Sequence, residues 1–447
     1  MRWFARFTVL LLSLLLAASA PACSDEVKSE RWREDLRELE RQLSERHVNL
    51  FHSVSRKAFE SAVSDLDRRI PSLTRPEILV GFAQIVAMVG DGHTSFYPGN
   101  QKKWWFHFYP IKLWSFSDGV YVIGTTGDHA DLFGKRLVRI DETPIEDAFR
   151  LISTTIGADN DMEYEYTVPF ELARPELLHV LGIAESADQA EFVFEGGVRK
   201  TFQAMTLKKW RGLDWRSANN LYEGLAPPSM RLEFLFATPL TLEHLKQRKY
   251  YWFTYLEEQR TLFLQYNQCW DQKDRPPFQE VVDELFRYMD GNPVERLIVD
   301  VRQNAGGEPK IAEPLIEGLE QRSEFGEAGR LFVLVGRRTF SAALTNAAQL
   351  RSRAGALIVG EPPRGKPNSP SEGRDIDLKR TKMWVTVSTQ FVERDPELGG
   401  ADYLPVDIDA AYTFEQYRNA EDPALDAALA AEIDRATELR SQSSVRR

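Results

Sequence analysis

Cysteine is almost absent from this chain of 447 residues, which contains only Cys23 and Cys269. Two cysteines cannot make a disulfide framework, so stability must come from burial of apolar side chains. They also cannot build a zinc site, and His93 has no second histidine at ligand spacing. We therefore expect no metal or other cofactor. Cys269 is a candidate nucleophile, but a buried structural cysteine is the simpler interpretation.

Basic blocks interleaved with aromatic residues are also missing. The chain has 56 basic and 67 acidic residues, which give a formal net charge of −11. This balance argues against nucleic acid as a partner. Hydrophobic residues make up 43% of the chain, which is typical of a globular protein. The length exceeds what one compact core usually fills, so we expect two or three domains.

The segment 1–22 has the layout of a secretory signal. Arg2 and Arg6 precede an apolar run at 7–18, and the small residues 20–22 follow it. The run is too short for a membrane span, so we expect export and removal of this segment. Cys23 then stands where a bacterial lipoprotein carries its lipid, although Ala and Pro depart from the usual preceding residues. The mature protein is expected in the periplasm, either soluble or membrane-anchored through lipid on Cys23.

Three regions follow the signal. Residues 23–100 form a helical region, because an apolar stripe at helical spacing begins at Trp32 and two further amphipathic stretches follow it. Residues 101–235 switch to alternating strands and form a small β-rich middle region. Residues 236–425 alternate between apolar strands and helices, which is typical of a sheet buried by helices. A polar tail, 426–447, ends the chain.

Ser341 is the most informative residue of the α/β region. It follows the buried strand 331–335 and a basic turn, and it precedes an alanine-rich helix. A serine at such a position has an exposed hydroxyl beside backbone N–H groups that point outward at the helix N-terminus. Those groups suit acyl transfer. The same pattern also fits an ordinary helix N-cap, so this stretch alone does not decide between them.

Two further loops stand at comparable strand ends. The first, 300–307, ends in Gly306 and Gly307, whose unhindered N–H groups suit an oxyanion hole. The second, 360–366, ends in Lys366, which lies beyond the helix and the returning strand. Because the ends of neighbouring strands meet at one edge of a sheet, Ser341 and Lys366 could meet there.

Four motifs in order carry a family resemblance. They are GDGHT at 90–94, DVRQNAGG at 300–307, TFSAA at 339–343 and GEPPRGK at 360–366. In this order they resemble the C-terminal processing, or tail-specific, serine peptidase family, in its branch with the tricorn core protease and the retinoid-binding repeats. The resemblance extends from about residue 36 to about residue 422.

The resemblance implies a fold, a reaction and its residues. The fold is an α/β catalytic domain of the ClpP/crotonase type, with a PDZ-like module in the middle region. That module lacks a clear carboxylate-binding loop here, so we expect a degenerate one. Ser341 is the implied nucleophile, and the N–H groups of Gly306 or Gly307 and of Ala342 are the implied oxyanion hole. The implied substrate is a peptide or protein.

The general base has two candidates. Lys366 matches the lysine of the tail-specific members, where a desolvated ammonium loses its proton near neutral pH. His93 matches the motif in which tricorn-like members carry a histidine base. The resemblance favours Lys366. The expected function is therefore an exported serine endopeptidase, and the alternative is an inactive protein on the same fold that binds peptides or small apolar ligands.

Overall fold

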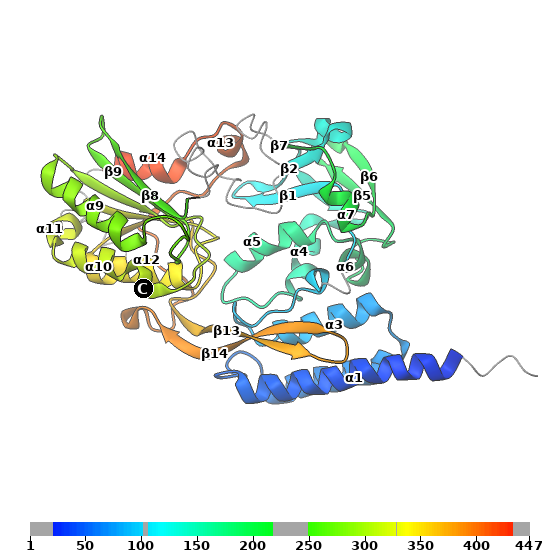
Figure 1. The fold of residues 1–447 in the computed structure, drawn as a ribbon. Helices are drawn as coiled ribbons and strands as arrows, with labels where there is room; N and C mark the ends of the chain where they lie inside the picture. The colour runs from blue at the N-terminus through cyan, green and yellow to red at the C-terminus, as the bar shows by residue number, and fades with distance from the viewer. Residues whose placement is uncertain (1–20, 102–105, 218–248, 328, 432–447) are drawn as a thin grey trace, which may run out of the picture.

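The computed structural model describes residues 21–101, 106–217, 249–327 and 329–431. The expected signal segment lies almost entirely outside these residues, as does most of the expected polar tail. Figure 1 shows a helical part, a middle part and an α/β part that follow one another along the chain. No helix in the described ranges is both long enough and apolar enough to span a membrane.

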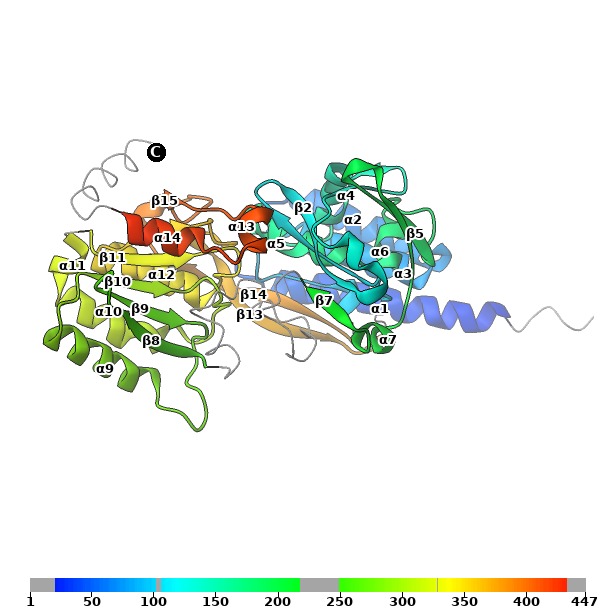
Figure 2. The same ribbon diagram turned by 90° about the horizontal axis from the view of Figure 1, so that it is seen from above.

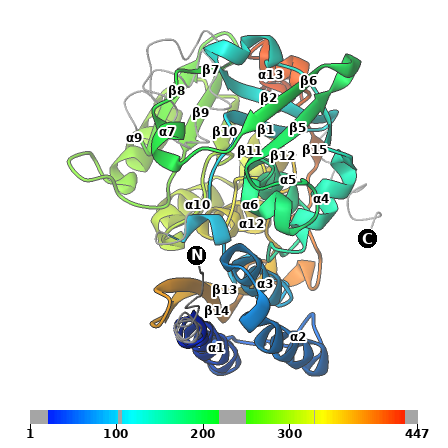
Figure 3. The same cartoon turned by 90° about the vertical axis from the view of Figure 1, so that its right-hand side faces the viewer.

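Among the described residues, the helical part contains three α-helices, and a hairpin from elsewhere in the chain packs on them. The apolar stripe from Trp32 to Leu43 is buried, as predicted, on the first helix. The long hairpin β13–β14 leaves the α/β part and packs along this helix, where Ile376 and Val385 join the same core. Figures 1 and 3 both show this arrangement. These elements are α1 (Pro21–Arg46), α2 (Arg56–Arg69), α3 (Arg75–Ala87), β13 (Asn368–Leu378) and β14 (Met383–Glu393).

The middle part has two small antiparallel sheets with helices beside them. One sheet has the order β1-β2-β7 and the other has the order β4-β3-β5-β6. The strands are β1 (Ile111–Phe116), β2 (Gly119–Thr126), β3 (Leu137–Ile140), β4 (Thr143–Pro144), β5 (Gln189–Phe194), β6 (Arg199–Gln203) and β7 (Trp215–Ser217). The helices are α4 (Ile145–Ser153), α5 (Met162–Glu171), α6 (Pro175–Val180) and α7 (Leu207–Arg211).

The α/β part is built on a sheet of the order β15-β12-β11-β10-β9-β8. In this sheet β9, β10, β11, β12 and β15 run parallel to their neighbours, and β8 pairs antiparallel with β9. The strands are β8 (Tyr251–Leu256), β9 (Thr261–Tyr266), β10 (Arg296–Asp300), β11 (Leu331–Val335), β12 (Leu357–Gly360) and β15 (Ile408–Asp409). The helices are α9 (Phe278–Gly291), α10 (Glu313–Glu320), α11 (Ser323–Glu327), α12 (Ala342–Ala354), α13 (Phe414–Arg418) and α14 (Pro423–Ala430).

Both faces of this sheet are covered, as the apolar strands predicted. Alternate residues of a strand point to opposite faces, so Val333 joins the core under α9, α10 and α12 while Phe332 joins the core under α14. Figure 2 shows α14 on the face opposite α9. Leu425 of α14 is buried, and this helix continues to Ala430, past the start of the expected polar tail.

The strand order brings the three loops of the sequence analysis together. β10, β11 and β12 are neighbours and parallel, so their carboxyl ends lie at one edge of the sheet. The loop that contains Gly306 follows β10, the turn that carries Ser341 follows β11, and the loop that contains Lys366 follows β12. Adjacent parallel strands are therefore the physical reason that distant sequence motifs share one site.

Candidate active site

Ser341 lies at a strained turn between β11 and α12. Its backbone has φ 53° and ψ −122°, a region that residues with a Cβ rarely adopt. Ser341 is the N-cap of α12, yet its side chain makes no capping hydrogen bond. The hydroxyl is therefore not used to cap the first turn of the helix. Strain of this kind is typical of functional sites, where surrounding packing holds a side chain in a chosen direction.

Gly306 packs directly against this turn. A Cβ added to Gly306 would lie 2.8 Å from the Ser341 Cβ and 3.1 Å from the Ala342 nitrogen, and its φ is +111°. Only glycine allows both this conformation and this approach. The Gly306 N–H already donates to the Asn304 Oδ1 at 2.9 Å. The role of Gly306 in this structure is thus to bring the loop close to Ser341.

Two backbone N–H groups near Ser341 remain without an acceptor. Among the described residues, neither the Gly307 N–H nor the Ala342 N–H donates to a backbone or side-chain group. Ala342 is also the first residue of α12, where the helix dipole favours negative charge. Both N–H groups are therefore suited to an anion that forms beside Ser341.

His93 lies beside the nucleophile turn. Its imidazole stacks on the ring of Phe340, with 4.3 Å between ring centroids and 21° between planes. Both ring nitrogens are buried, and neither has a hydrogen-bond partner among the described residues. Burial, together with the Arg394 and Arg364 guanidinium groups, lowers the pKa of His93 to about 3. The ring is therefore neutral at physiological pH and has a lone pair available.

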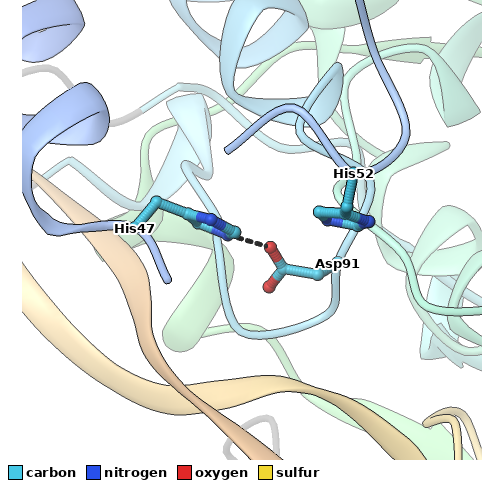
Figure 4. A group of neighbouring side chains, drawn as sticks. All are labelled: His47, His52 and Asp91. Atoms are coloured by element: carbon cyan, nitrogen blue, oxygen red, sulfur yellow. Dashed lines mark hydrogen bonds and ion pairs between the residues drawn. The ribbon is translucent and has the colours of Figure 1, made fainter. Parts of the chain in front are cut away.

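Asp91 anchors the loop that carries His93. Its Oδ1 accepts from the backbone N–H of His93 at 3.0 Å and from that of Thr94 at 2.7 Å. The Ser388 hydroxyl of β14 donates to the same oxygen at 2.5 Å. On the other side, Oδ2 lies 2.8 Å from the His47 Nε2, as Figure 4 shows. Asp91 thus ties the end of α1 and β14 to the backbone of the candidate base.

The ligand atoms of His47, His52 and Asp91 lie within 4.8 Å of one another, so a metal ion must be considered. The Nδ1 of His47 accepts from the Asn49 N–H at 3.0 Å, so its Nε2 carries the proton. That proton is donated to Asp91. A metal would have to displace it and break the anchor, so these residues fit a hydrogen-bonded support better than a metal site.

The backbone of Lys366 lies close to the site, and its ammonium group forms an ion pair with Asp402. The preceding Gly365 packs against Phe340, and the Lys366 carbonyl accepts from Arg394. Its Nζ lies 2.7 Å from the Asp402 Oδ1, and one-third of the side chain is exposed. The amine that a lysine base would use is therefore engaged by Asp402. The surroundings of the two candidate bases therefore favour His93.

Asp159 is a buried carboxyl group that the sequence analysis did not single out. Its Oδ2 has no hydrogen-bond partner among the described residues, and it lies 3.1 Å from the position of a Cβ on Gly92. Burial, and then the charge of Asp91, raise the pKa of Asp159 to about 7. The next residue, Asn160, donates to the Pro363 and Asp402 carbonyls. No local sequence signal marks Asp159, because its burial depends on loops far away in the chain.

Of the two cysteines, the structure describes the side chain of Cys269 alone. Cys269 is fully buried, and burial raises the pKa of its thiol to about 11. A buried neutral thiol is a poor nucleophile, which agrees with the structural interpretation. Cys23 falls near the start of α1, and nothing is described of its side chain. The lipid expected on Cys23 therefore stays a prediction.

The fold and the site define a mixed α/β protein with a serine at a strand-to-helix turn of a mostly parallel sheet. The chain is similar to mature CPAF, with a TM-score of 0.57 and 13% identity over 93% of this chain and 98% of that chain. A structure of mature CPAF complexed with lactacystin gives 0.57 and 12% identity over 93% of this chain and 100% of that one. The photosystem II D1 C-terminal processing protease has a TM-score of 0.37 and 13% identity, over 86% of this chain and 92% of that chain.

The two CPAF similarities establish the fold. No family model matches the sequence, and no curated protein matches it. The CPAF matches extend over nearly the whole of both chains, so the helical, middle and α/β parts share one arrangement with a known structure. The resemblance drawn from the four motifs is confirmed at the level of the fold. At 13% identity the chemistry must be argued from the residues of this chain.

Proposed function

We propose that this protein is a serine peptidase of the C-terminal processing type, which hydrolyses peptide bonds through an acyl-enzyme on Ser341. The observation that carries the proposal is the strained Ser341 turn, packed against Gly306 and beside the neutral imidazole of His93. Acyl transfer requires a serine hydroxyl that does not cap its helix, backbone N–H groups without an acceptor, and a buried histidine. An ordinary helix N-cap has no need of the strain or of the histidine.

In the proposed mechanism, His93 accepts the proton of the Ser341 hydroxyl as Oγ attacks the peptide carbonyl. The tetrahedral oxyanion is held by the Gly307 and Ala342 N–H groups, and each such donor is worth about 3 kcal/mol of the barrier. His93 then donates its proton to the leaving amine, and water completes hydrolysis by the same route. No hydrogen bond joins the described Ser341 hydroxyl to His93, so the ring must move towards it when substrate binds.

Asp159 completes the charge balance of this mechanism. A protonated His93 would face the Arg394 and Arg364 guanidinium groups, which oppose its charge. An ionised carboxylate nearby offsets that penalty. Asp159 is buried beside Gly92 and Phe340, and it has an unpartnered oxygen. We therefore assign it to the stabilisation of the His93 imidazolium.

Lys366 is the second candidate for the base. For that role it would have to leave Asp402 and lose its proton within reach of Ser341. Its backbone position near Phe340 keeps it close to the site, so Lys366 is the alternative base. The present ion pair fits a role in holding the loop after β12.

The fold type of each part and the location of the protein can also be inferred. We propose that the α/β part is of the ClpP/crotonase type, and that the two small sheets and α4 include a degenerate PDZ-like module. Export to the periplasm and lipid on Cys23 are proposed from the segment 1–22 and from Cys23. Fractionation of cells that express the full chain, with mass spectrometry of the mature N-terminus, tests both.

The function is tested by hydrolysis of unfolded protein and of quenched peptides. The wild type should cleave both, and Ser341→Ala should lose about a thousandfold or more in kcat. Ser352→Ala is the matched control, because Ser352 lies on the same helix and bonds only to the Ala348 carbonyl. Equal activity of the wild type and Ser341→Ala would contradict the proposal. A folded wild type that binds peptides without cleaving them would favour the inactive binding protein.

A further inference from the structure

A small pocket, lined mainly by apolar surface, lies between the middle part and the α/β part, at the edge of the sheet that also carries the Ser341 turn. Its wall includes Trp114 of β1, Tyr166 of α5 and Tyr412, which follows β15. The remainder comes from the carboxyl ends of β10, β11 and β12, through Gln303, Gly336 and Gly360. In parallel sheets this edge is where ligands bind. None of the proposed catalytic residues contributes to the wall, so the pocket is separate from the reacting atoms.

The wall leads directly into both loops of the site. Gln303 immediately precedes Asn304, whose side chain holds the Gly306 N–H. Arg338 also belongs to the wall and precedes Ser341 by three residues. Arg338 and Ser341 are three residues apart, so at most about 11 Å separates them, and an extended substrate covers that distance with about three residues. A peptide held at Ser341 therefore has a side chain within reach of this pocket.

Three charged groups of the wall, Arg302, Arg337 and Glu361, form ion pairs within the protein. Arg302 makes ion pairs with Asp300 at 2.7 Å and with Asp422 at 2.5 Å. Arg337 pairs with Glu361 at 2.8 Å and donates to the Ser115 carbonyl. Arg338 is engaged as well. A charged side chain that entered the pocket would lose its hydration without gaining a partner, so a charged occupant is disfavoured.

The apolar part of the wall is aromatic and shaped by ring contacts. Trp114 and Tyr166 pack edge to face, with 5.9 Å between centroids. Val335, Ala410 and Ala424 add small apolar surfaces beside them. Aromatic walls with small residues between them accept large, flat or branched side chains and gain the most from their burial.

We propose that this pocket is a specificity subsite that takes an aromatic or large aliphatic side chain of the substrate, within three residues of the cleaved bond. The inference rests on the proposed peptidase function and adds a substrate class to it. The gain comes from burial of apolar area, about 25 cal/mol for each Å². The paired charges of the wall give selection against acidic and basic side chains.

The test uses the full chain and a mixture of peptides whose cleavage sites are mapped by mass spectrometry. Two peptides that differ by Phe or Ala at the selected position are then compared. Ala410→Phe should fill the pocket and lower kcat/KM for the Phe peptide about tenfold relative to the Ala peptide. Ala411→Phe is the matched control, because Ala411 is the adjacent residue, is similarly half-buried and is not part of the wall.

The outcomes separate the subsite from the peptidase function. Cleavage near large apolar residues, with selective loss in Ala410→Phe alone, supports the subsite. Cleavage without preference, or an equal effect of Ala410→Phe and Ala411→Phe, overturns the subsite and leaves the peptidase function standing. A folded wild type that hydrolyses no peptide overturns both.

Discussion

The imidazole of His93 stacks on the ring of Phe340, the residue that immediately precedes Ser341. The Arg364 guanidinium lies over the same ring, with its Cζ 4.2 Å from the ring centroid. Phe340 thus joins the loop of the candidate base, the loop after β12 and the nucleophile turn. Because the His93 loop is anchored through Asp91 to α1 and β14, the helical part and the α/β part must both fold before the site is complete.

The identity of the base gives the first prediction. His93→Ala should lower kcat by about a hundredfold to ten-thousandfold, the usual contribution of general base catalysis. Lys366→Met should have a much smaller effect, because it removes an ion pair with Asp402 that is partly exposed. Steady-state kinetics on one peptide measures both. Circular dichroism of each variant verifies that it is folded.

The reverse order of these effects would identify Lys366 as the base. Asp402→Asn distinguishes a structural role of the ion pair from a chemical one. If Lys366 acts only by holding its loop, Asp402→Asn and Lys366→Met should change kcat to a similar, small extent.

The pH dependence of stability gives the second prediction. The folded protein raises the pKa of Asp159 from 3.8 to about 7, so it holds this proton more tightly than the unfolded chain does. The contribution is fully present below about pH 4. It should be lost as the pH rises to about 7, at up to about 1.4 kcal/mol for each pH unit. Urea unfolding of the wild type and of Asp159→Asn between about pH 4 and about pH 8 measures the difference.

Asp159→Asn does not titrate, so its stability relative to the wild type should increase across this range. The same carboxyl group should control activity: kcat of the wild type should rise with pH as Asp159 ionises, near pH 7. Asp159→Asn should lose that rise. If stability and activity change with pH in the same way in the wild type and in Asp159→Asn, Asp159 has neither role.

The contact between Gly306 and Ser341 gives the third prediction. Gly306→Ala places a methyl group 2.8 Å from the Ser341 Cβ and requires a residue with a side chain at φ +111°. We expect activity to fall by at least about a hundredfold, because the nucleophile is displaced. Gly400→Ala is the control, because a Cβ at that position meets nothing within 4 Å. Normal activity of Gly306→Ala would show that the close packing is not needed.

The core of the site was predictable from sequence because its signals are local. A buried strand, a basic turn and an alanine-rich helix placed Ser341 at a strand-to-helix turn, and paired glycines marked the loop beside it. Their meeting also followed from general rules, since parallel strands joined by helices become neighbours in the sheet. The contacts of Gly306 bring it against Ser341 and Ala342, and the catalytic roles of these residues stay predictions.

The surroundings of the site were not predictable because they depend on distant partners. Nothing near Lys366 indicates that its ammonium pairs with Asp402. Nothing near Asp91 indicates that its carboxylate joins His47 and Ser388. The hairpin β13–β14 also packs on α1, so a boundary between the helical and the α/β regions does not describe their cores. These contacts set the surroundings of the two candidate bases, whereas the preference for Lys366 comes from its match to the lysine of the tail-specific members.

The most direct test of the account is covalent labelling of the folded wild type with a fluorophosphonate probe, followed by peptide mapping. The account predicts one adduct, on Ser341, and none in Ser341→Ala. It also predicts much slower labelling in His93→Ala and nearly normal labelling in Lys366→Met. A wild type that cleaves peptides without an adduct on Ser341, or an equal adduct in Ser341→Ala, would contradict the assignment of Ser341 as the nucleophile.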